Sequence, residues 1–442
     1  MGIGIKKHLC GLTLNRILFF AGNICLQSFV TFLPTKCLME ALTAPTQRLA
    51  TPFIKQRITS IDFLRGLVMV IMALDHVRDY FHAEAMIDDP TNLATTTPFL
   101  FFTRWITHFC APTFLFLSGI SAFLSGQKKT KKELSFFLFT RGLWLVLLEV
   151  TIISFAWRFD PLQHMIILQV IWAIGISMII LSAVIWLPLP VIICIGFAIL
   201  LGHNLLDKPE SDLKNQVNLF WRIAHTPGGN FLLPMGENRS VLFFYGFLSW
   251  TGIMILGYCF GHIYKNTVSR KERKKMLLAI GLVSIASFII LRFINGYGDR
   301  APWSFQKDTE LSIISFFNTT KYPPSLMYTL MTLGPSILFL AFFENMKGRF
   351  AKFFITFGRV PFFYYLSHLF LIHSLTIIAF YASGYGAKDI ITQPFYFRPP
   401  EFGYSLWAVY GIWAAVVLLL YPLCKWYDRY KSTHNHWALS YL

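Results

Sequence analysis

Apolar runs long enough to cross a bilayer dominate this chain and limit what it can fold into. A membrane-spanning helix needs about 20 mostly apolar residues, and ten such runs follow residue 56. Because a lipid interior offers no partners for backbone N–H and C=O groups, each run is predicted to be an α-helix. The predicted spans are residues 61–82, 98–125, 134–156, 165–186, 188–206, 241–264, 276–294, 325–343, 353–380 and 404–426. The predicted fold class is therefore all-α, a polytopic integral membrane protein of about ten transmembrane helices.

Composition supports this class and argues against a soluble protein. Hydrophobic residues make up 55% of the 442 residues and charged residues only 14%, which is too little charge to cover a soluble surface. The net charge of +17 lies in short basic clusters between the apolar runs. Such clusters are typical of topology signals in loops, so no nucleic-acid partner is expected. The lipid bilayer is the expected partner.

The basic clusters also predict how the spans are oriented. If ten spans alternate, GQKKTKKE, KNTVSRKERKK, ENMKGRFAK and the tail KWYDRYK all fall on one side. The positive-inside rule makes that side the cytoplasm. The loop at residues 83–97, which is acidic and has no Lys or Arg, falls on the other side. Both ends of the ten-span body are therefore expected to be cytoplasmic, in a cell (inner) membrane.

Residues 1–56 stand apart from this pattern. Within them, residues 17–33 form an interrupted apolar stretch after two lysines, which suits either a signal sequence or an eleventh span. A cleaved signal would leave the basic residues just before residue 58 outside, against the charges of the other loops. The preferred prediction is a dispensable extension, with Met39 as a candidate start, before one membrane domain at residues 57–437.

The first span carries more ionisable groups than a lipid-facing helix tolerates. Asp62, Arg65, Asp75, His76 and Asp79 lie in it, and ionisable groups at membrane depth are functional candidates. Arg65 and His76 are eleven residues apart, so they lie within about 20° of one helix face and roughly 16 Å apart along the axis. This polar stripe suits a long substrate with an anchor at the inner end and a histidine base near the outer end. Alternatively, Arg65 snorkels to the inner interface and the Asp-His pair meets outer water.

The second span adds His108 and Arg104. His108 lies about ten residues from the outer end, at a depth comparable with His76, and Pro112 beyond it is expected to kink the helix. Histidine acts as a general base near neutral pH, although a core histidine bonded to a carbonyl is the alternative for His108. Arg104 is interpreted as an outer anchor or substrate clamp, because a guanidinium does not deprotonate.

The third and ninth spans carry secondary candidates. Arg141 and Glu149 are eight residues apart on the third span and nearly share a face, which favours structural ion pairs with neighbouring helices. His368 on the ninth span is deep enough to line a cavity or to be a satisfied core group. No glycine-rich phosphate loop, nucleophile elbow or pair of histidines at metal spacing occurs in a span, so no metal is expected.

Four motifs spread from Arg57 to His373 resemble a known family. RITSIDFLRGLVMVIMALDH, APTFLFLSGISAFL, KYPPSLMYTLMTLGP and GRVPFFYYLSHLFLIH are similar to bacterial relatives of the heparan-alpha-glucosaminide N-acetyltransferase catalytic domain. They resemble the acyltransferase-3 family more distantly; there an Arg and a His with ten residues between them form the hallmark pair, matched here by Arg65 and His76. The resemblance implies acyl-CoA, expected to be acetyl-CoA, held from the cytoplasmic side. It also implies acyl delivery to an extracytoplasmic glycan or glycolipid.

The resemblance leaves the identity of the base open. The lysosomal acetyltransferase has Asn where His76 falls and a candidate histidine in the following loop, for which the nearest match here is His82. The base is therefore His76, His82 or His108. The resulting hypothesis is a membrane acyltransferase in which His76 takes the acceptor proton or carries the acyl group, and Asp75 or Asp79 orients it.

The hypothesis assigns three arginines to acyl-CoA binding, and two other functions are alternatives to acyl transfer. Arg65 is expected to contact the phosphate or pantetheine part of acyl-CoA, and Arg104 and Arg141 are further candidates for holding it. The main rival is a transporter or flippase of a polar lipid or sugar that uses the same polar stripe as a proton relay. A catalytically inactive scaffold is a third alternative, and a homodimer is compatible with the sequence.

Overall fold

Helices dominate the structure, a computed structural model that describes residues 58–85, 87–209, 217–226, 229–344, 346–391, 395–434 and 436. The predicted extension at residues 1–56 lies outside these ranges. Within them, seven helical segments are long and apolar enough to cross a membrane. They are Pro98–Gly126, Lys131–Arg158, Leu189–Pro209, Phe247–Tyr264, Arg270–Ile294, Pro361–Ala382 and Leu406–Thr433. The prediction of a mainly helical integral membrane protein is confirmed.

Most of the longer helices coincide with the predicted apolar runs, but two runs are divided. The run predicted as one span at residues 353–380 forms α16 (Arg349–Arg359) and α17 (Pro361–Ala382), and the run at residues 241–264 begins with the strand β3 (Ser240–Phe243) before its helix. The longer helices are α3 (Thr59–Phe81), α4 (Pro98–Thr107), α5 (Cys110–Gly126), α6 (Lys131–Leu148), α8 (Val170–Val184), α9 (Leu189–Gly202), α12 (Phe247–Phe260), α13 (Arg270–Ile294), α14 (Thr309–Phe317), α15 (Leu326–Phe342), α16 (Arg349–Arg359), α17 (Pro361–Ala382) and α18 (Leu406–Thr433). Shorter helical pieces are η1 (Glu149–Ile153), α7 (Ser154–Arg158), η2 (His203–Leu206), α11 (Leu219–Ala224), η4 (Gly261–Tyr264) and η5 (Ala387–Asp389). The strands are β1 (Met165–Leu168), β2 (Phe231–Pro234) and β3 (Ser240–Phe243).

Local sequence explains where two of the basic helices begin. Thr130 and Glu133 form a capping box at the start of α6, and Ser269 and Glu272 form another at the start of α13. In each box the hydroxyl accepts a backbone N–H of the first turn and the glutamate accepts the N–H of the capping residue. The basic clusters of the sequence therefore lie beside well-defined helix starts.

The second span is interrupted between α4 and α5 at His108 and Phe109, whose backbone angles remain in the right-handed helical region, so α4 and α5 still form one helical segment. Pro112 has no N–H to donate to the carbonyl of His108, four residues earlier. That carbonyl instead accepts the hydroxyl of Tyr328 on α15 at 2.7 Å. A proline thus both interrupts the helix and frees an acceptor that links it to a neighbour.

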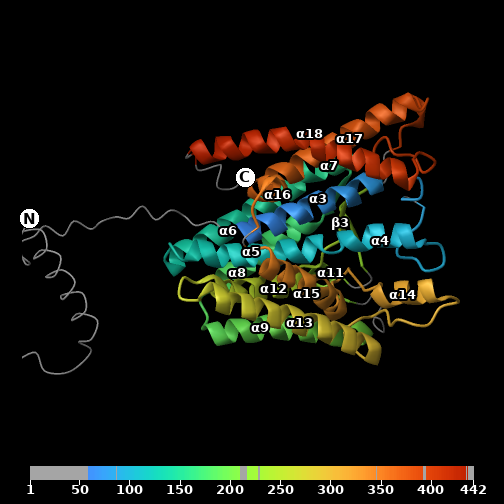
Figure 1. The fold of residues 1–442 in the computed structure, drawn as a ribbon. Helices are drawn as coiled ribbons and strands as arrows, with labels where there is room; N and C mark the ends of the chain where they lie inside the picture. The colour runs from blue at the N-terminus through green and yellow to red at the C-terminus, as the bar shows by residue number, and fades with distance from the viewer. Residues whose placement is uncertain are drawn as a thin grey trace, which may run out of the picture. The chain divides into compact units, whose positions relative to one another are not determined.

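Close glycine contacts fix the position of α3 in the bundle. It packs against α16, α17 and α18 and also against α4 and α5, and Figure 1 shows it between these two groups. A Cβ added at Gly358 of α16 would lie 1.8 Å from the carbonyl oxygen of Asp62, and one at Gly66 would lie 1.8 Å from that of Phe354. Only glycine allows the two backbones to approach this closely.

A small three-stranded sheet departs from the all-α prediction. Its order is β1-β3-β2, with β1 parallel and β2 antiparallel to β3. The strand β1 lies within the run predicted as a span at residues 165–186, whose helix begins only at Val170. Short apolar runs do not distinguish strand from helix by periodicity, which explains why the sequence did not predict this sheet.

Candidate active site

His76 on α3 and His368 on α17 meet inside the helix bundle. His76 Nδ1 lies 2.7 Å from His368 Nε2, and the two rings stack with centroids 4.9 Å apart at an interplanar angle of 13°. His368 is fully buried, and His76 keeps 8% of its surface exposed. Helix packing therefore joins the strongest histidine candidate to a secondary one that is 292 residues away in the sequence.

The hydrogen bonds of this pair determine which nitrogen carries each proton. His368 Nδ1 lies 2.9 Å from the carbonyl oxygen of Tyr364. A carbonyl only accepts, so this nitrogen carries a hydrogen. In a neutral His368, Nε2 is then an acceptor, and His76 Nδ1 donates to it. His76 Nε2 is left with a lone pair, which is the form that a general base or nucleophile requires.

Aromatic rings surround the histidine pair. Trp157 of α7 meets the His76 ring edge-on, with centroids 4.7 Å apart. Tyr364 stacks on His368 at 5.2 Å, and Tyr365 lies edge-on to it at 5.6 Å. These contacts restrict rotation of both imidazoles and separate them from lipid.

A hydrogen-bonded turn follows α7, the helix that carries Trp157. Asp160 is buried and accepts the backbone N–H groups of Leu162 and His164, as well as the ring Nδ1–H of His164 at 3.0 Å. Burial alone would raise the pKa of Asp160, but these donors hold that pKa below its ordinary value. Asp160 therefore stays ionised at neutral pH and stabilises the turn that ends α7.

Asp75 faces two arginines instead of His76. Its Oδ1 lies 3.1 Å from Arg78 Nη2, and its Oδ2 accepts Nη1 of Arg104 on α4. Arg78 Nη2 also pairs with Asp79 at 2.6 Å. Adjacent residues of an α-helix project about 100° apart, so Asp75 points to α4 while His76 points to α17. The expectation that Asp75 or Asp79 orients His76 is corrected accordingly, because His368 makes that contact.

Arg65 links three helices near the start of α3. Its Nη1 donates to Asp62 Oδ1 and to the carbonyl of Gly358 on α16, both at 3.1 Å. Its Nη2 donates to the hydroxyl of Ser121 on α5 at 3.0 Å. Arg65 therefore faces protein rather than lipid, and its partners include one carboxylate and two neutral acceptors.

The stripe between Arg65 and His76 lies inside the bundle. Met69 and Met72, between them on α3, are buried. Both ends of the stripe contact the α16–α17 side of α3, through Gly358 for Arg65 and His368 for His76. Neither end of the stripe therefore points at lipid.

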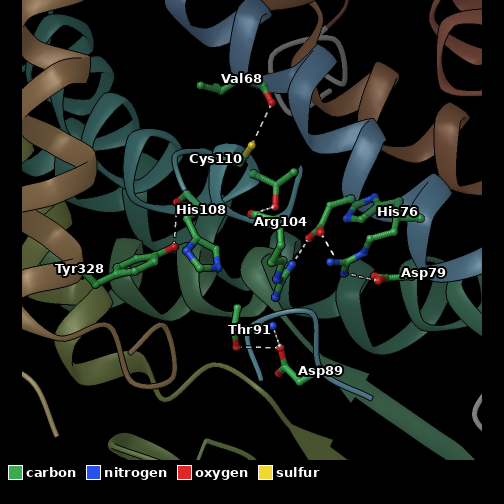
Figure 2. Close-up of polar contacts among 12 residues, drawn as sticks. Val68, His76, Asp79, Asp89, Thr91, Arg104, His108, Cys110 and Tyr328 are labelled. Carbon is green, nitrogen blue, oxygen red and sulfur yellow. Dashed lines mark hydrogen bonds and ion pairs between the residues drawn. The ribbon is translucent and has the colours of Figure 1, made fainter. Parts of the chain in front are cut away.

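His108 is buried at the break between α4 and α5 but does not contact His76. Its ring centroid lies 5.4 Å from that of Tyr328, and its Nδ1 has no hydrogen-bond partner among the described residues. Figure 2 shows the Arg104 side chain between His108 and His76. The two candidate bases are therefore separated by the Asp75–Arg104 ion pair.

His82 follows the last residue of α3 and is fixed by the loop that joins α17 to α18. Its carbonyl accepts Nη2 of the buried Arg398 at 2.6 Å, and its backbone forms an isolated parallel bridge with Tyr404. His82 lies six residues after His76, about 9 Å further along the helix axis. The two histidines therefore lie at different depths.

Glu149 has a different neighbour from the one predicted. Glu149 is buried in the π-helical turn η1, and its Oε1 accepts the backbone N–H of Gln169 at 2.6 Å. This N–H opens α8, where the helix dipole favours a carboxylate, so Glu149 binds a helix start rather than an arginine. Arg141 is half-buried on α6, with its guanidinium carbon 6.0 Å from the ring centroid of Phe137.

Arg78 is a charged group of the site that sequence reasoning misses. Arg78 is buried between Asp75 and Asp79, and its spacing of three residues from Asp75 is the signal that could have found it. Within the described ranges, no three His, Cys, Asp or Glu side chains come together as a metal site.

Comparison with known proteins places the chain in a family. The family model described as heparan-alpha-glucosaminide N-acetyltransferase, catalytic, matches residues 57–291, which is more than half of the 442 residues. The match runs from α3 into α13 and includes His76 and His108, whereas His368 lies beyond it. Comparison with curated proteins gives no match. The chain belongs to the heparan-alpha-glucosaminide N-acetyltransferase catalytic family, as the resemblance of its motifs predicted.

Proposed function

We propose that residues 57–437 form a transmembrane acyltransferase. It moves an acetyl group from cytoplasmic acyl-CoA to a hydroxyl or amine of an extracytoplasmic glycan or glycolipid. The observation that carries the proposal is the His76–His368 pair, which leaves a lone pair on His76 Nε2 inside the bundle. The family match supports acetyl transfer as the reaction. The expected location is the inner cell membrane, and a homodimer is compatible with the proposal.

The proposed topology has ten spans, with both ends of the body in the cytoplasm. The ten proposed spans are the seven long apolar helices, the shorter apolar helices α8 and α15, and α3. Helix ends that carry basic clusters meet one another: Arg273 Nε donates to Glu344 at 2.8 Å, and Arg359 to Asp428 at 2.9 Å. In Figure 1 these ends lie on the same side as the turn between α5 and α6. The positive-inside rule assigns this side to the cytoplasm.

The proposed chemistry uses His76 Nε2 as a general base. The acceptor hydroxyl or amine loses its proton to Nε2 while its oxygen or nitrogen bonds to the thioester carbonyl carbon. The C–S bond then breaks, and the proton passes from His76 to the departing CoA sulfur. His368 Nε2 accepts the Nδ1–H of His76 and so stabilises the imidazolium that forms between these steps. Direct attack by Nε2 on the thioester, with an acyl-histidine as intermediate, is the alternative route.

Acyl-CoA is proposed to enter from the inner ends of the helices. Arg65 and Arg141 are the proposed contacts for its phosphate or pantetheine part. The acceptors around Arg65 include two neutral ones, a carbonyl and a hydroxyl, and a phosphate binds a guanidinium more strongly than these do. CoA would then exchange for the neutral acceptors while Asp62 stays in place.

His368 is expected to act as a positioning residue for His76. His368→Ala removes the acceptor for His76 Nδ1–H, so the rate constant kcat should fall about 10- to 100-fold and its pH profile should shift, with KM for acetyl-CoA unchanged. His368→Gln keeps an acceptor oxygen and should restore part of the rate. His373→Ala is the matched control, because His373 is equally buried on α17 but its ring nitrogens face the carbonyls of Ala156 and Tyr396 instead of a second histidine. An equal change in both alanine variants would contradict this role.

A transporter or flippase is the rival, since interior ion pairs such as Asp75–Arg104 also suit a relay for moving charge. The two functions differ in their need for CoA. Purified protein in liposomes, given radiolabelled acetyl-CoA and envelope glycans, is expected to transfer label to the glycan. Movement of unmodified glycan across the bilayer without CoA would favour transport and contradict the proposal.

A further inference from the structure

Two side chains that contact the His76 ring carry hydrogen-bond donors that the proposed chemistry does not use. Trp157 of α7 lies edge-on to the imidazole, with ring centroids 4.7 Å apart. Tyr365 of α17 also lies edge-on to it, with centroids 6.4 Å apart. Their donors are the indole Nε1–H and the phenol O–H, here called the donor pair. The donor pair therefore belongs to the two rings that flank the proposed base.

Both members of the donor pair are buried and unpaired. Trp157 is 2% exposed and Tyr365 is 3% exposed. Neither the indole Nε1 nor the phenol oxygen has a hydrogen-bond partner among the described residues. The indole faces the Tyr365 hydroxyl without a hydrogen bond between them, so the two donors converge. A buried donor without an acceptor is unfavourable, because its hydration is lost without compensation.

Packing alone does not explain these two residue types. A phenylalanine at either position would restrict the imidazole with its ring and would bury no unpaired polar group. Unpaired donors also occur elsewhere in the bundle, for example on Trp250 and Tyr427. The donor pair differs from these, because both of its rings contact His76.

The surrounding side chains hold the donor pair in position. The Tyr80 hydroxyl donates to the backbone carbonyl of Trp157, and the rings of Tyr80 and Phe395 lie at 20° and 26° to the indole plane. Tyr365 lies three residues before His368 on α17, and its ring meets that imidazole edge-on at 5.6 Å. Donors that are fixed in advance stabilise a developing charge without reorganisation.

Acyl transfer requires donors of this kind. When the acceptor oxygen or nitrogen bonds to the thioester carbonyl carbon, the C=O π electrons move onto the carbonyl oxygen, which becomes negatively charged. Hydrogen bonds to that oxygen are worth more in a site from which water is excluded. In the proposed chemistry His76 and His368 manage the proton, and the charge on the carbonyl oxygen still requires donors.

We propose that Trp157 Nε1–H and Tyr365 O–H form the oxyanion hole of the transferase. The inference rests on the proposed function and deepens it by assigning two further catalytic residues. The thioester carbonyl oxygen accepts both hydrogen bonds as its charge develops, and both donors keep their hydrogens. The electron pair then returns to the carbonyl as the C–S bond breaks, and the departing CoA sulfur takes the proton from His76.

Removal of one donor at a time tests the assignment by kinetics. Tyr365→Phe removes only the hydroxyl, and Trp157→Phe removes the indole N–H. Each is expected to lower kcat for acetyl transfer by about 100-fold, as for the loss of one oxyanion-hole donor. Kd for acetyl-CoA should stay unchanged, because the stabilised charge exists only in the transition state.

Trp250→Phe and Tyr427→Phe are the matched controls. Both parent residues are buried and carry an unpaired donor, but their rings lie against Tyr245 and Phe363 respectively. Each control removes the same chemical group as its counterpart in the donor pair. Both controls should therefore keep the wild-type kcat.

A binding measurement separates this inference from the proposed function. The full-length protein in detergent is titrated by calorimetry with a trifluoromethyl ketone analogue of acetyl-CoA, which hydrates to a tetrahedral form. S-ethyl-CoA, which lacks the carbonyl, is titrated in parallel. Tyr365→Phe and Trp157→Phe are expected to weaken binding of the ketone about tenfold or more and to leave binding of S-ethyl-CoA unchanged.

Several outcomes would overturn the inference. Wild-type kcat in both donor-pair variants would do so, as would an equal loss in these variants and in their controls. Equal weakening of the ketone and of S-ethyl-CoA would assign the two residues to ground-state binding of CoA instead. If the donor-pair variants discriminate between the two probes but the wild type transfers no acetyl group, the proposed function fails while the carbonyl site stands. If transfer requires His76 but neither donor, the reverse holds.

Discussion

His76→Ala is expected to lower acetyl transfer by about 100- to 10,000-fold, the range typical for loss of a general base. The change removes the imidazole whose Nδ1–H is donated to His368 and whose Nε2 keeps a lone pair beside the stripe. The measurement is label transfer from acetyl-CoA by the purified variant under single-turnover conditions. Its Tm should stay within a few degrees of the wild-type value.

A second histidine pair provides a matched control for this variant. His203 and His225 are both buried, and Nδ1 of the first lies 3.2 Å from Nε2 of the second. His203→Ala also breaks a buried imidazole pair but should leave the rate of transfer unchanged. Full activity in His76→Ala, with loss of activity in His82→Ala or His108→Ala, would move the role of base to one of those residues.

Gly358→Ala is expected to destabilise the protein by about 3 kcal/mol, the upper part of the range for overpacking. The new Cβ would lie 1.8 Å from the carbonyl oxygen of Asp62, and backbone on α3 cannot move aside as a flexible side chain would. The helices would have to separate, which would also break the bond from Arg65 to the Gly358 carbonyl. Thermal unfolding in detergent, followed by intrinsic fluorescence, measures the effect.

Gly411→Ala is the matched control for Gly358→Ala. Gly411 also lies inside a long helix, α18, but a Cβ there would meet no atom within 4 Å. Alanine has the higher helix propensity, so this change should be neutral or stabilising by up to about 1 kcal/mol. An unchanged Tm in Gly358→Ala would mean that α3 and α16 are not in close backbone contact.

Much of the helical framework can be predicted from the sequence, because a lipid environment leaves a membrane-spanning segment few alternatives to the helix. An apolar run must be helical to satisfy its own backbone, and Pro112 marks the break between α4 and α5. The strand β1 escapes prediction, because MIIL continues directly into an apolar helix and is too short to show a period of two. Gly66 and Gly358 lie far apart in sequence, so their contact appears only when α3 and α16 are packed together.

The candidate site is predictable in its residue types but not in its pairings. The face shared by Arg65 and His76 follows from helical geometry. Sequence adjacency suggested Asp75 as the partner of His76, but adjacent side chains on a helix diverge, and Asp75 faces Arg104. The contact between His76 and His368 depends on where α17 packs against α3. Local patterns carry no information about that packing.

The most direct test of the account is the sidedness of transfer in oriented proteoliposomes. Protease access to the basic segments at the ends of α5 and α12 establishes the orientation of the protein. Radiolabelled acetyl-CoA is then supplied on one face of the membrane only, and the acceptor is supplied on the other face. The account predicts labelled acceptor only when acetyl-CoA is on the face with the basic segments, and its loss in His76→Ala. Transfer that requires donor and acceptor on the same face, or that survives in His76→Ala at the wild-type rate, would contradict it.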